Sequence, residues 1–430
     1  MIQPSAQVRA TSAPRQNYGT ALAAITTVFF MWGFVTVLND ILIPHLKAIF
    51  DLNYAQSTFV QFIFFSAYFI LALPSAKIIS ALGYQNSITT GLSVMGLGAL
   101  IFVPAATIPS YPLFLVAFYV LASGMTILQV AANPYVAALG PEDKASSRLN
   151  LAQAMNSLGT TIGPAIGGFL ILSATTGTGE RGLTPEQLQA HRALEASSVK
   201  MPYIGIAILL FVLAFVLSRF HFPVMSTIED ADHHVHGDQG NVWKIPHLVL
   251  GAVGIFVYVG AEVAIGSLLV SYLTQPEIGA LTPVAAAAYL SYYWGGLMVG
   301  RLAGSAVMRR IKPGIVLGCA AMIACALVLT TIVTTGHIAM WSVILVGLFN
   351  SIMFPTIFTL GIDGLGKLTG KGSGVLIMAI VGGAVIPFAM GALADRIGLH
   401  RSFILPAVCY LYIMYYGWKG SKHGRVLTAA

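Results

Sequence analysis

An acidic residue lies inside an apolar segment near the start of the chain. Asp40 follows Asn39 in the stretch VLNDILIPHLK (37–47), at the end of an apolar run that begins near Thr20. Placing a carboxylate inside a membrane helix costs about 2.5–3.5 kcal/mol on insertion scales, and such residues usually have a function. The Asp side chain is too short to reach far toward the membrane surface. We therefore predict that Asp40 faces an internal cavity and exchanges a cation there.

A second acid, Glu262, lies in another apolar stretch, YVGAEVAIGS (258–267). A polar side chain in such a place either contacts a neighbouring helix or faces a cavity. We favour the cavity, because a carboxylate makes hydrogen bonds that distinguish the hydroxyl groups of a ligand by their geometry. Glu262 is therefore predicted to bind substrate.

Amide and aromatic side chains accompany the two acids in the apolar segments. Amides often do no more than bridge helices. Many amides with few charges, together with rings such as Trp32 that can stack on an apolar face, are nevertheless typical of a sugar site. The predicted binding residues besides Glu262 are Asn133, Gln153, Asn156, Tyr258, Tyr292, Trp294 and Asn350.

The composition places the chain in a lipid bilayer. Of 430 residues, 57% are hydrophobic and 9% are charged, whereas soluble proteins have about 25% charged residues. The net charge of +7 does not indicate a nucleic-acid partner, because basic residues of membrane proteins gather in cytoplasmic loops. The three cysteines lack metal-site spacing, and no catalytic motif lies in the apolar segments. We expect no enzyme, no metal and no cofactor.

Twelve apolar segments are long enough to cross a bilayer core of about 30 Å. They are continuous rather than alternating, so they predict helices and not strands. The expected fold class is therefore an all-α membrane protein with twelve transmembrane helices. The segments are 18–46, 56–82, 86–107, 111–139, 149–175, 201–220, 244–273, 284–309, 313–334, 338–365, 371–396 and 400–419.

The distribution of basic residues predicts that both termini are cytoplasmic. In that orientation sixteen of the 22 Lys and Arg residues lie on the cytoplasmic side and only six on the outer side, which agrees with the positive-inside rule. These six are Lys47, Arg181, Arg192, Lys200, Arg396 and Arg401.

The two halves of the chain repeat each other. NSLGTTIGPAIGG (156–168) aligns with AIVGGAVIPFAMG (379–391), so that Gly159 matches Gly382. ANPYVAALG and MFPTIFTLG align in the same way. Duplicated helical halves are typical of alternating-access carriers, in which the substrate lies between the halves near the midplane.

The repeat sets the predicted domain boundaries. We expect two six-helix bundles joined by a polar cytoplasmic linker and flanked by cytoplasmic tails. The ranges are 1–17 for the first tail, 18–220 for the first bundle, 221–243 for the linker, 244–419 for the second bundle and 420–430 for the last tail.

Five stretches resemble the fucose/glucose/galactose–cation symporter family of the major facilitator superfamily. They are WGFVTVLNDILIPHLK (32–47), AANPYVAALGPE (131–142), RLNLAQAMNSLG (148–159), YVGAE (258–262) and FPTIFTLGI (354–362). The resemblance covers nearly the whole chain. It implies the major facilitator fold and transport of a hexose such as glucose or galactose, with mannose and fucose also open.

The resemblance further implies that Asp40 couples the cation to the sugar. In fucose–proton members, the block similar to TILQVAANPY (126–135) carries a glutamate that helps to relay the proton, whereas this chain has Gln129, which cannot titrate. Coupling then depends on Asp40 alone, on Asp40 with Glu262, or on a sodium site to which Asn39, Asp40 and Gln129 contribute oxygens.

The stretch GRLAGSAVMRRIKPG (300–314) resembles the superfamily's signature cytoplasmic loop between spans eight and nine. It is expected to steady the outward-open state. Its counterpart after span two, PSAKIISALGYQNS (74–87), lacks the acid and the arginine of the signature.

Together these features predict a secondary active importer in the inner membrane of a bacterium. We expect a monomer whose partners are a hexose, a coupling H⁺ or Na⁺ and the lipid bilayer, and which works by alternating access. The alternative is an exporter of drugs or metabolites on the same architecture. Such exporters usually have an apolar, aromatic cavity rather than one lined with amides.

Overall fold

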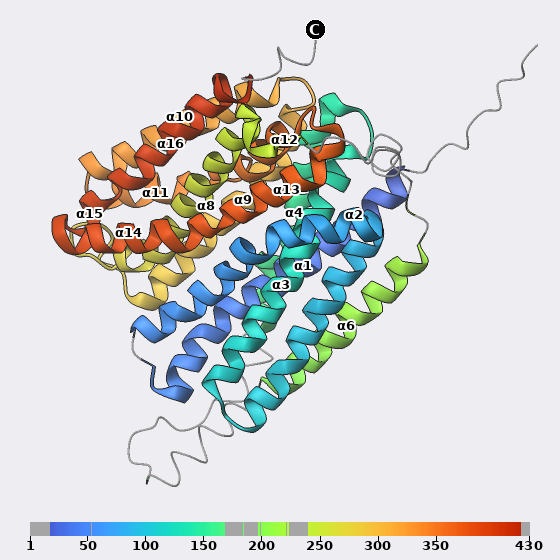
Figure 1. Cartoon of the computed structure of the whole chain (residues 1–430). Coiled ribbons are helices and arrows are strands. Elements are labelled where there is room, and N and C mark those ends of the chain that lie inside the picture. Colours follow the sequence, from blue (N-terminus) through green and yellow to red (C-terminus); the bar gives the residue numbers. More distant parts are fainter. Residues whose placement is uncertain are drawn as a thin grey trace, which may run out of the picture.

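The computed structural model describes residues 18–52, 54–167, 184, 197, 199–220, 222 and 240–422. These residues form helices joined by short connections, and none of those described lies in a strand (Figure 1). The predicted all-α fold class is confirmed.

The first half of the chain contains a long helix that bends at a glycine. In α2 the backbone at Gly83 has φ 75° and ψ 171°, a conformation that glycine adopts far more readily than other residues. Gly83 lies between the predicted spans 56–82 and 86–107, so this bend takes the place of a loop. The helices of this half are α1 (Tyr18–Phe50), α2 (Tyr54–Thr107), α3 (Tyr111–Ala138), α4 (Ala145–Gly167) and α6 (Lys200–Arg219).

The second half contains predicted spans that are divided into shorter helices. The span at 338–365 comprises α11 and α12, and the span at 371–396 comprises α13, η6 and α14. The helices of this half are α8 (Pro246–Leu273), α9 (Pro283–Val307), α10 (Pro313–Val333), α11 (Gly336–Asn350), α12 (Met353–Ile362), α13 (Thr369–Met378), α14 (Gly382–Ile397), α15 (Leu399–Ser402) and α16 (Ile404–Trp418). Short 3₁₀ helices are η1 (Glu142–Lys144), η4 (Val242–Lys244), η5 (Gly366–Leu368), η6 (Ala379–Val381) and η7 (Gly420–Lys422).

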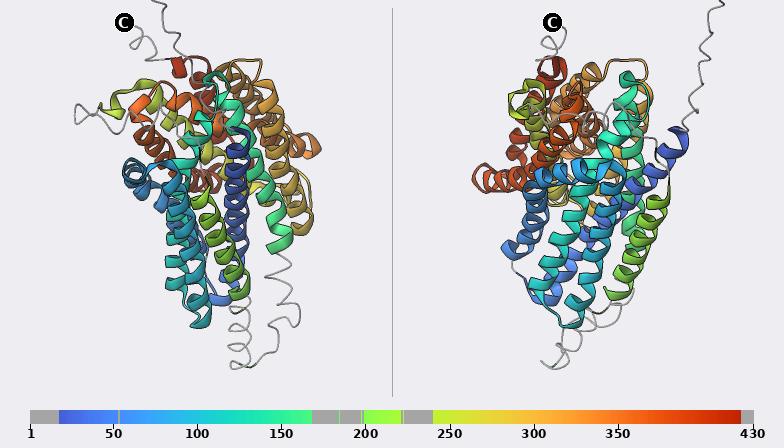
Figure 2. Two further views of the ribbon diagram at one scale, coloured as in Figure 1. Left: turned by 90° about the vertical axis from the view of Figure 1, so that its right-hand side faces the viewer. Right: turned by 45° about the vertical axis from the view of Figure 1, so that its right-hand side comes forward.

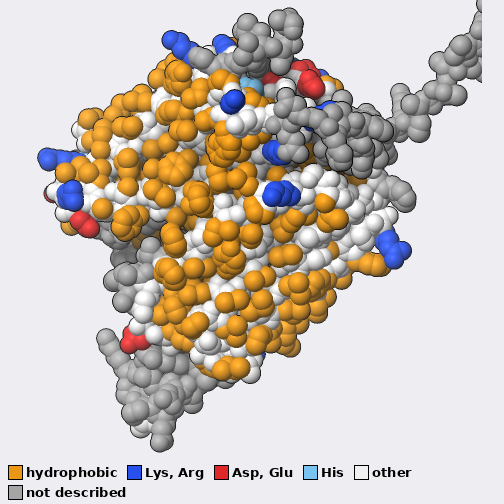
Figure 3. Space-filling view, viewed as in Figure 1, with side chains coloured by type: hydrophobic (Ala, Val, Ile, Leu, Met, Phe, Trp, Pro, Cys, Tyr) orange, Lys and Arg blue, Asp and Glu red, His pale blue; other side chains and the backbone are white. Residues whose placement is uncertain are grey.

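The described residues of each of the twelve predicted spans are mostly helical, with turns or irregular residues at some span ends and at breaks such as 351–352. Eight helical stretches of the described part are long and apolar enough to cross a membrane, and one of them, Phe59–Thr107, contains two predicted spans. The other predicted spans, at α4, α9 and α15–α16, are shorter or richer in small and polar residues. Hydrophobic side chains cover most of the face seen in Figure 3, as expected for a surface in contact with lipid.

The helices gather into two bundles that follow the halves of the sequence. In Figures 1 and 2 the first half (blue to green) and the second half (yellow to red) lie side by side. The contact between them is made where α4 packs against α9 and α12, and where α13 packs against α2 and α3. The ends of the bundles away from this contact point in different directions in Figure 1.

The internal repeat is expressed in helix packing. A Cβ added to Gly159 of α4 would overlap the carbonyl oxygen of Phe30 in α1, and a Cβ added to the matching Gly382 of α14 would overlap the carbonyl oxygen of Phe256 in α8. Small residues let membrane helices approach this closely. In each bundle, the aligned glycine therefore allows its helix to pack closely against the neighbouring helix.

Hydrogen bonds join the bundles near the start of α4. The hydroxyls of Ser146 and Thr359 lie 2.5 Å apart. Ser147 Oγ donates to the carbonyl of Ser305 at 2.7 Å, and Ser305 Oγ donates back to the carbonyl of Ser147 at 2.9 Å. The bundles are thus closed on each other at this end, which we call the closed end.

Candidate functional site

Side chains from both bundles line a cavity of about 210 Å³. Helices α1 to α4 contribute one wall, and α8, α9, α12 and η6 contribute the other. Of the predicted site residues, those that line it are Gln129, Gln153, Asn156, Tyr258, Glu262 and Trp294.

The wall from the first bundle presents amides that are only partly paired. Gln129 Nε2 donates to the hydroxyl of Tyr68 at 2.8 Å, and Asn156 Nδ2 donates to the carbonyl of Phe29 at 3.1 Å. Gln129 Oε1 and Gln153 Nε2 are buried without a hydrogen-bond partner in the described structure. An unpaired buried polar atom costs roughly 1–3 kcal/mol. A ligand that offers both a donor and an acceptor would remove that cost.

The wall from the second bundle presents the carboxylate of Glu262, which accepts a hydrogen bond from Tyr258, while Tyr293 bonds to the backbone of Glu262. Tyr258 donates its hydroxyl to Glu262 Oε1 at 2.6 Å, one helical turn away on α8. Tyr293 donates to the carbonyl oxygen of Glu262 at 3.2 Å and accepts from Asn350 Nδ2 at 3.0 Å. The Glu262 carboxylate is therefore fixed in place, and its second oxygen can accept from a ligand.

Arg301 of α9 lines the same cavity and also reaches the first bundle. Its side chain is 8% exposed. Nη1 donates to the carbonyl of Gln153 at 3.0 Å and to the hydroxyl of Ser157, both in α4. Nε donates to the carbonyl of Ser351 at 3.2 Å, at the end of α11. One guanidinium thus joins the two bundles at the cavity wall.

Aromatic rings complete the cavity. Trp32, Phe64 and Phe65 come from the first bundle, and Trp294 and Phe354 come from the second. The indole of Trp294 lies where α8 has a glycine, because a Cβ added to Gly266 would lie 2.9 Å from its Cζ2 atom. Flat rings beside amides and a carboxylate suit a ligand that has both apolar faces and hydroxyl edges.

Three predicted binding residues lie away from this cavity. Asn133 is buried in α3 and Asn350 is buried at the end of α11. Tyr292 is 60% exposed, and its ring packs against Tyr289 and Trp341. Tyr292 lies two positions before Trp294 on α9, which turns it to another face of the helix. A role for these three in binding stays a prediction.

Asp40 and Asn39 belong to α1, but their side chains lie outside the described part of the structure. Trp32 and Thr36, which line the cavity, precede Asp40 by eight and four residues. Positions four apart share one face of a helix. Asp40 therefore occupies the next position along the stripe of α1 that lines the cavity.

Sequence reasoning missed Arg301 and Tyr68. An arginine inside an apolar helix is as costly as an aspartate, so the rule that selected Asp40 also applies to Arg301. The resemblance of GRLAGSAVMRRIKPG to a signature loop hides this signal, although Arg301 lies inside the predicted span 284–309. Tyr68 carries no comparable signal, since a tyrosine in a membrane helix is common.

Comparison with known proteins identifies the family. Residues 21–386 match the model of the Major Facilitator Superfamily. A glucose/galactose transporter of Brucella abortus is 51% identical over 411 residues, 96% of each chain. The chain belongs to the major facilitator superfamily. Within it, the expected resemblance to the glucose/galactose and fucose transporters is confirmed.

Solved structures of this superfamily support the same assignment. The Escherichia coli fucose:proton symporter FucP matches with a TM-score of 0.85 and 34% identity, over 94% of this chain and 98% of that one. FucP in the outward conformation matches with a TM-score of 0.86 and 35% identity, over 93% and 98%. As a member of the superfamily, the protein is a multi-pass membrane transporter and not an enzyme.

Proposed function

We propose that the protein is a secondary active importer that moves a hexose together with a cation. The observation that carries this proposal is the cavity between the bundles, where unpaired Gln129 Oε1, unpaired Gln153 Nε2 and the fixed Glu262 carboxylate lie among aromatic rings. Acceptors and donors in this arrangement match the hydroxyl edge of a pyranose, and the rings match its apolar face. The glucose/galactose transporter relative supports the same class of substrate.

The closed end is assigned to the cytoplasm. The positive-inside rule gives this orientation from the basic residues, and the similarity to FucP in its outward conformation supports it. The cavity then opens away from the cytoplasm in this state. Sugar and cation enter from outside, and both termini are cytoplasmic, in the inner membrane of a bacterium.

Asp40 is proposed as the residue that couples the cation to the sugar. It follows Trp32 and Thr36 along the face of α1 that lines the cavity. When a cation neutralises this carboxylate, closing a dry cavity over it costs less. That difference is the coupling free energy between cation and conformation.

We propose the proton as the coupling ion, because the Escherichia coli relative is a fucose:proton symporter. Gln129 cannot relay a proton, and in this structure it is paired with Tyr68. Asp40 would then be the principal site of protonation. Sodium bound by Asn39, Asp40 and Gln129 is the alternative.

The proposal is tested by counterflow in proteoliposomes. Purified protein is reconstituted with an internal load of glucose, galactose, mannose or fucose, and entry of the labelled sugar is measured with and without sodium. We expect saturable counterflow of at least one of these hexoses. If a folded, reconstituted protein supports counterflow of none of the four, the proposed substrate class is wrong.

A further inference from the structure

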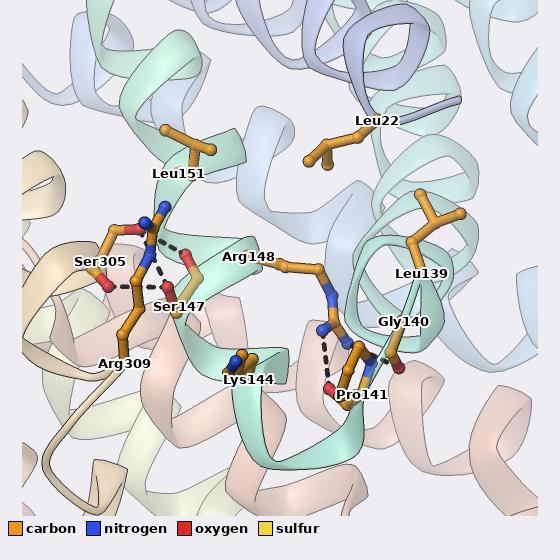
Figure 4. Close-up of a pocket in the computed structure, with 10 residues that line it drawn as sticks. All are labelled: Leu22, Leu139, Gly140, Pro141, Lys144, Ser147, Arg148, Leu151, Ser305 and Arg309. Atoms are coloured by element: carbon orange, nitrogen blue, oxygen red, sulfur yellow. Dashed lines mark hydrogen bonds between the residues drawn. The ribbon is translucent and has the colours of Figure 1, made fainter. Parts of the chain in front are cut away.

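A second cavity, of about 340 Å³, lies at the closed end and is separate from the proposed sugar site. Leu22 of α1, the α3–α4 connection and the first turns of α4 form most of its wall, and Ser305 and Arg309 of the second bundle complete it (Figure 4). The reciprocal hydrogen bonds between Ser147 and Ser305 lie in this wall. The cavity therefore exists in this form only while the two bundles are closed here.

The charged residues that line this cavity are Lys144, Arg148 and Arg309, and no acid is among its described lining residues. The neighbouring acids Glu142 and Asp143 are exposed and do not line it. Asp143 interacts electrostatically with Arg148, so the positive charge left for a ligand is mainly that of Lys144 and Arg309, which attracts an anion. The cavity thus has the electrostatic character of an anion site.

The three cations differ in how they are held. Arg148 donates from Nη1 to the carbonyl of Pro141 at 2.7 Å and from Nε to the carbonyl of Val136 at 3.3 Å, so its charge is fixed in the wall. Lys144 and Arg309 are exposed side chains. In Figure 4, Arg309 lies beside Ser147 and Ser305, on the side opposite Arg148. Lys144 belongs to the first bundle and Arg309 to the second.

We propose that this cavity binds a phosphate-bearing anion and that the bound anion holds the closed end shut. Guanidinium and ammonium groups bind phosphate oxygens by charge-assisted hydrogen bonds. An anion bound to both Lys144 and Arg309 has higher affinity for the closed arrangement than for one in which the bundles separate. Such a difference in affinity shifts the conformational equilibrium toward the closed arrangement.

The ligand class follows from the size and lining of the cavity. Besides the cations, Leu22, Leu139 and Leu151 line it, so there is room and an apolar surface for a body attached to the phosphate. A cytoplasmic phosphomonoester and the headgroup of an anionic phospholipid share this chemistry. Resting on the proposed function and orientation, a phosphorylated sugar inside the cell would slow further import by this route.

The test measures binding and transport separately on the full chain. Thermal melting of the detergent-solubilised protein is followed with increasing inorganic phosphate or glucose 6-phosphate, with chloride matched for ionic strength. Counterflow is followed in phosphatidylcholine vesicles that contain the same probe, and in vesicles of phosphatidylcholine mixed with phosphatidylglycerol. A rise in melting temperature does not depend on sugar transport, so it stands even if the proposed substrate is wrong.

We expect a phosphate probe to stabilise the protein and to slow counterflow. The Lys144→Gln/Arg309→Gln double variant should bind the probe about tenfold more weakly, which corresponds to losing hydrogen bonds to a charged group. Lys367→Gln, a change at an exposed basic residue that does not line the cavity, should behave as the wild type. Arg309→Lys keeps the charge and should keep the effect, which serves as the check if the double variant does not fold.

Three outcomes of this test distinguish the possible ligands of the cavity. An effect of the soluble probes in phosphatidylcholine vesicles supports a cytoplasmic phosphomonoester. An effect only of phosphatidylglycerol, lost in the double variant, supports the lipid headgroup. No effect of any probe, or an equal effect on the double variant and on Lys367→Gln, overturns the proposal.

Discussion

Two opposite charges line the proposed sugar site and have different tasks. Glu262 is held by Tyr258 within α8 and leaves one oxygen for a ligand. Arg301 donates from Nε and Nη1 to two backbone carbonyls and to Ser157, so these donors serve contacts within the protein. Glu262 and Arg301 carry opposite charges that offset each other, so under the proposed mechanism the charge of Asp40 is the one that a cation changes.

The first prediction concerns Asp40. Asp40→Asn removes the charge that a cation would neutralise, so uphill accumulation should be abolished while counterflow persists. Accumulation and counterflow are measured in the same vesicles, and Asp395→Asn, a change at an exposed acid, is the matched control. Retained gradient-driven accumulation by Asp40→Asn would remove this residue from the coupling mechanism.

The second prediction concerns Glu262. Glu262→Gln keeps the shape of the side chain but loses charge-assisted hydrogen bonds to the ligand, each contributing about 1.5–3 kcal/mol. The half-saturating sugar concentration in counterflow should rise about tenfold or more. Glu277→Gln alters an exposed acid and should change nothing. An unchanged half-saturating concentration would mean that Glu262 does not contact the sugar.

At the scale of elements, α9 links the substrate cavity to the closed end. Trp294 and Arg301 line the cavity, and Ser305 lies one turn further on and bonds to Ser147 of the other bundle. Arg301 also holds the end of α11 through Ser351. Because one rigid helix carries all these groups, opening the closed end must break the contacts of Arg301 with α4.

The third prediction follows from this link. Arg301→Met should shift the protein toward the state opened at the closed end by about tenfold or more, since hydrogen bonds to a charged group are lost. The shift is read as a longer distance between spin labels at Asp143→Cys and Lys312→Cys, in a background without Cys319, Cys325 and Cys409.

Arg401→Met is the control for this experiment, because Arg401 is exposed, does not line the cavity and lies outside the 300–314 stretch. Arg301→Lys keeps the charge without the forked geometry and should lie between the wild type and Arg301→Met. If Arg301→Met gives the wild-type distance distribution, the guanidinium does not hold the bundles together.

The fourth prediction concerns the repeated glycines. Gly159→Ala and Gly382→Ala would each place a Cβ against a carbonyl oxygen of the neighbouring helix, and overpacking of this kind costs about 1–3 kcal/mol. Both variants should melt at a lower temperature than the wild type. Gly391→Ala, where a Cβ meets nothing within 4 Å, should melt at the wild-type temperature or above it.

At the scale of the whole molecule, both bundles contribute to the cavity that lies between them. The contacts at the closed end and the cavity between the bundles agree with one of the two states that the proposed alternating access requires. Asn133 and Asn350 retain buried amide atoms without partners in this state. Under the proposed mechanism, we expect these atoms to gain hydrogen-bond partners when the bundles rearrange.

The fifth prediction concerns the driving ion. If protons couple, a pH gradient that is acidic outside should drive hexose accumulation in sodium-free vesicles, and the external medium should become more alkaline during uptake. The measurement is labelled-sugar uptake with an external pH indicator. Uptake that requires added sodium and ignores the pH gradient would select the sodium alternative.

Much of this molecule follows from the sequence by itself. The number of predicted spans follows from the lengths of the apolar segments. Their helical type follows because backbone groups in a bilayer must be hydrogen-bonded, and a continuous apolar segment of this length achieves that as a helix. The repeat is equally readable, since close packing tolerates only glycine at Gly159 and Gly382. Polar or amphipathic side chains in apolar helices usually have a function. This rule predicts the cavity residues Gln129, Gln153, Asn156, Tyr258, Glu262 and Trp294.

Only the tertiary structure decided which of those groups meet. Periodicity along one helix does not fix its rotation against a neighbour, so Tyr292 and Trp294 could not be told apart until α9 was packed against α4 and α11. Arg301 lies near the end of the predicted span 284–309 with no sign of its partners, because Gln153, Ser157 and Ser351 lie about 50 to 150 residues away in the chain. Contacts between distant segments depend on how whole bundles pack, and no local pattern of residues encodes that packing.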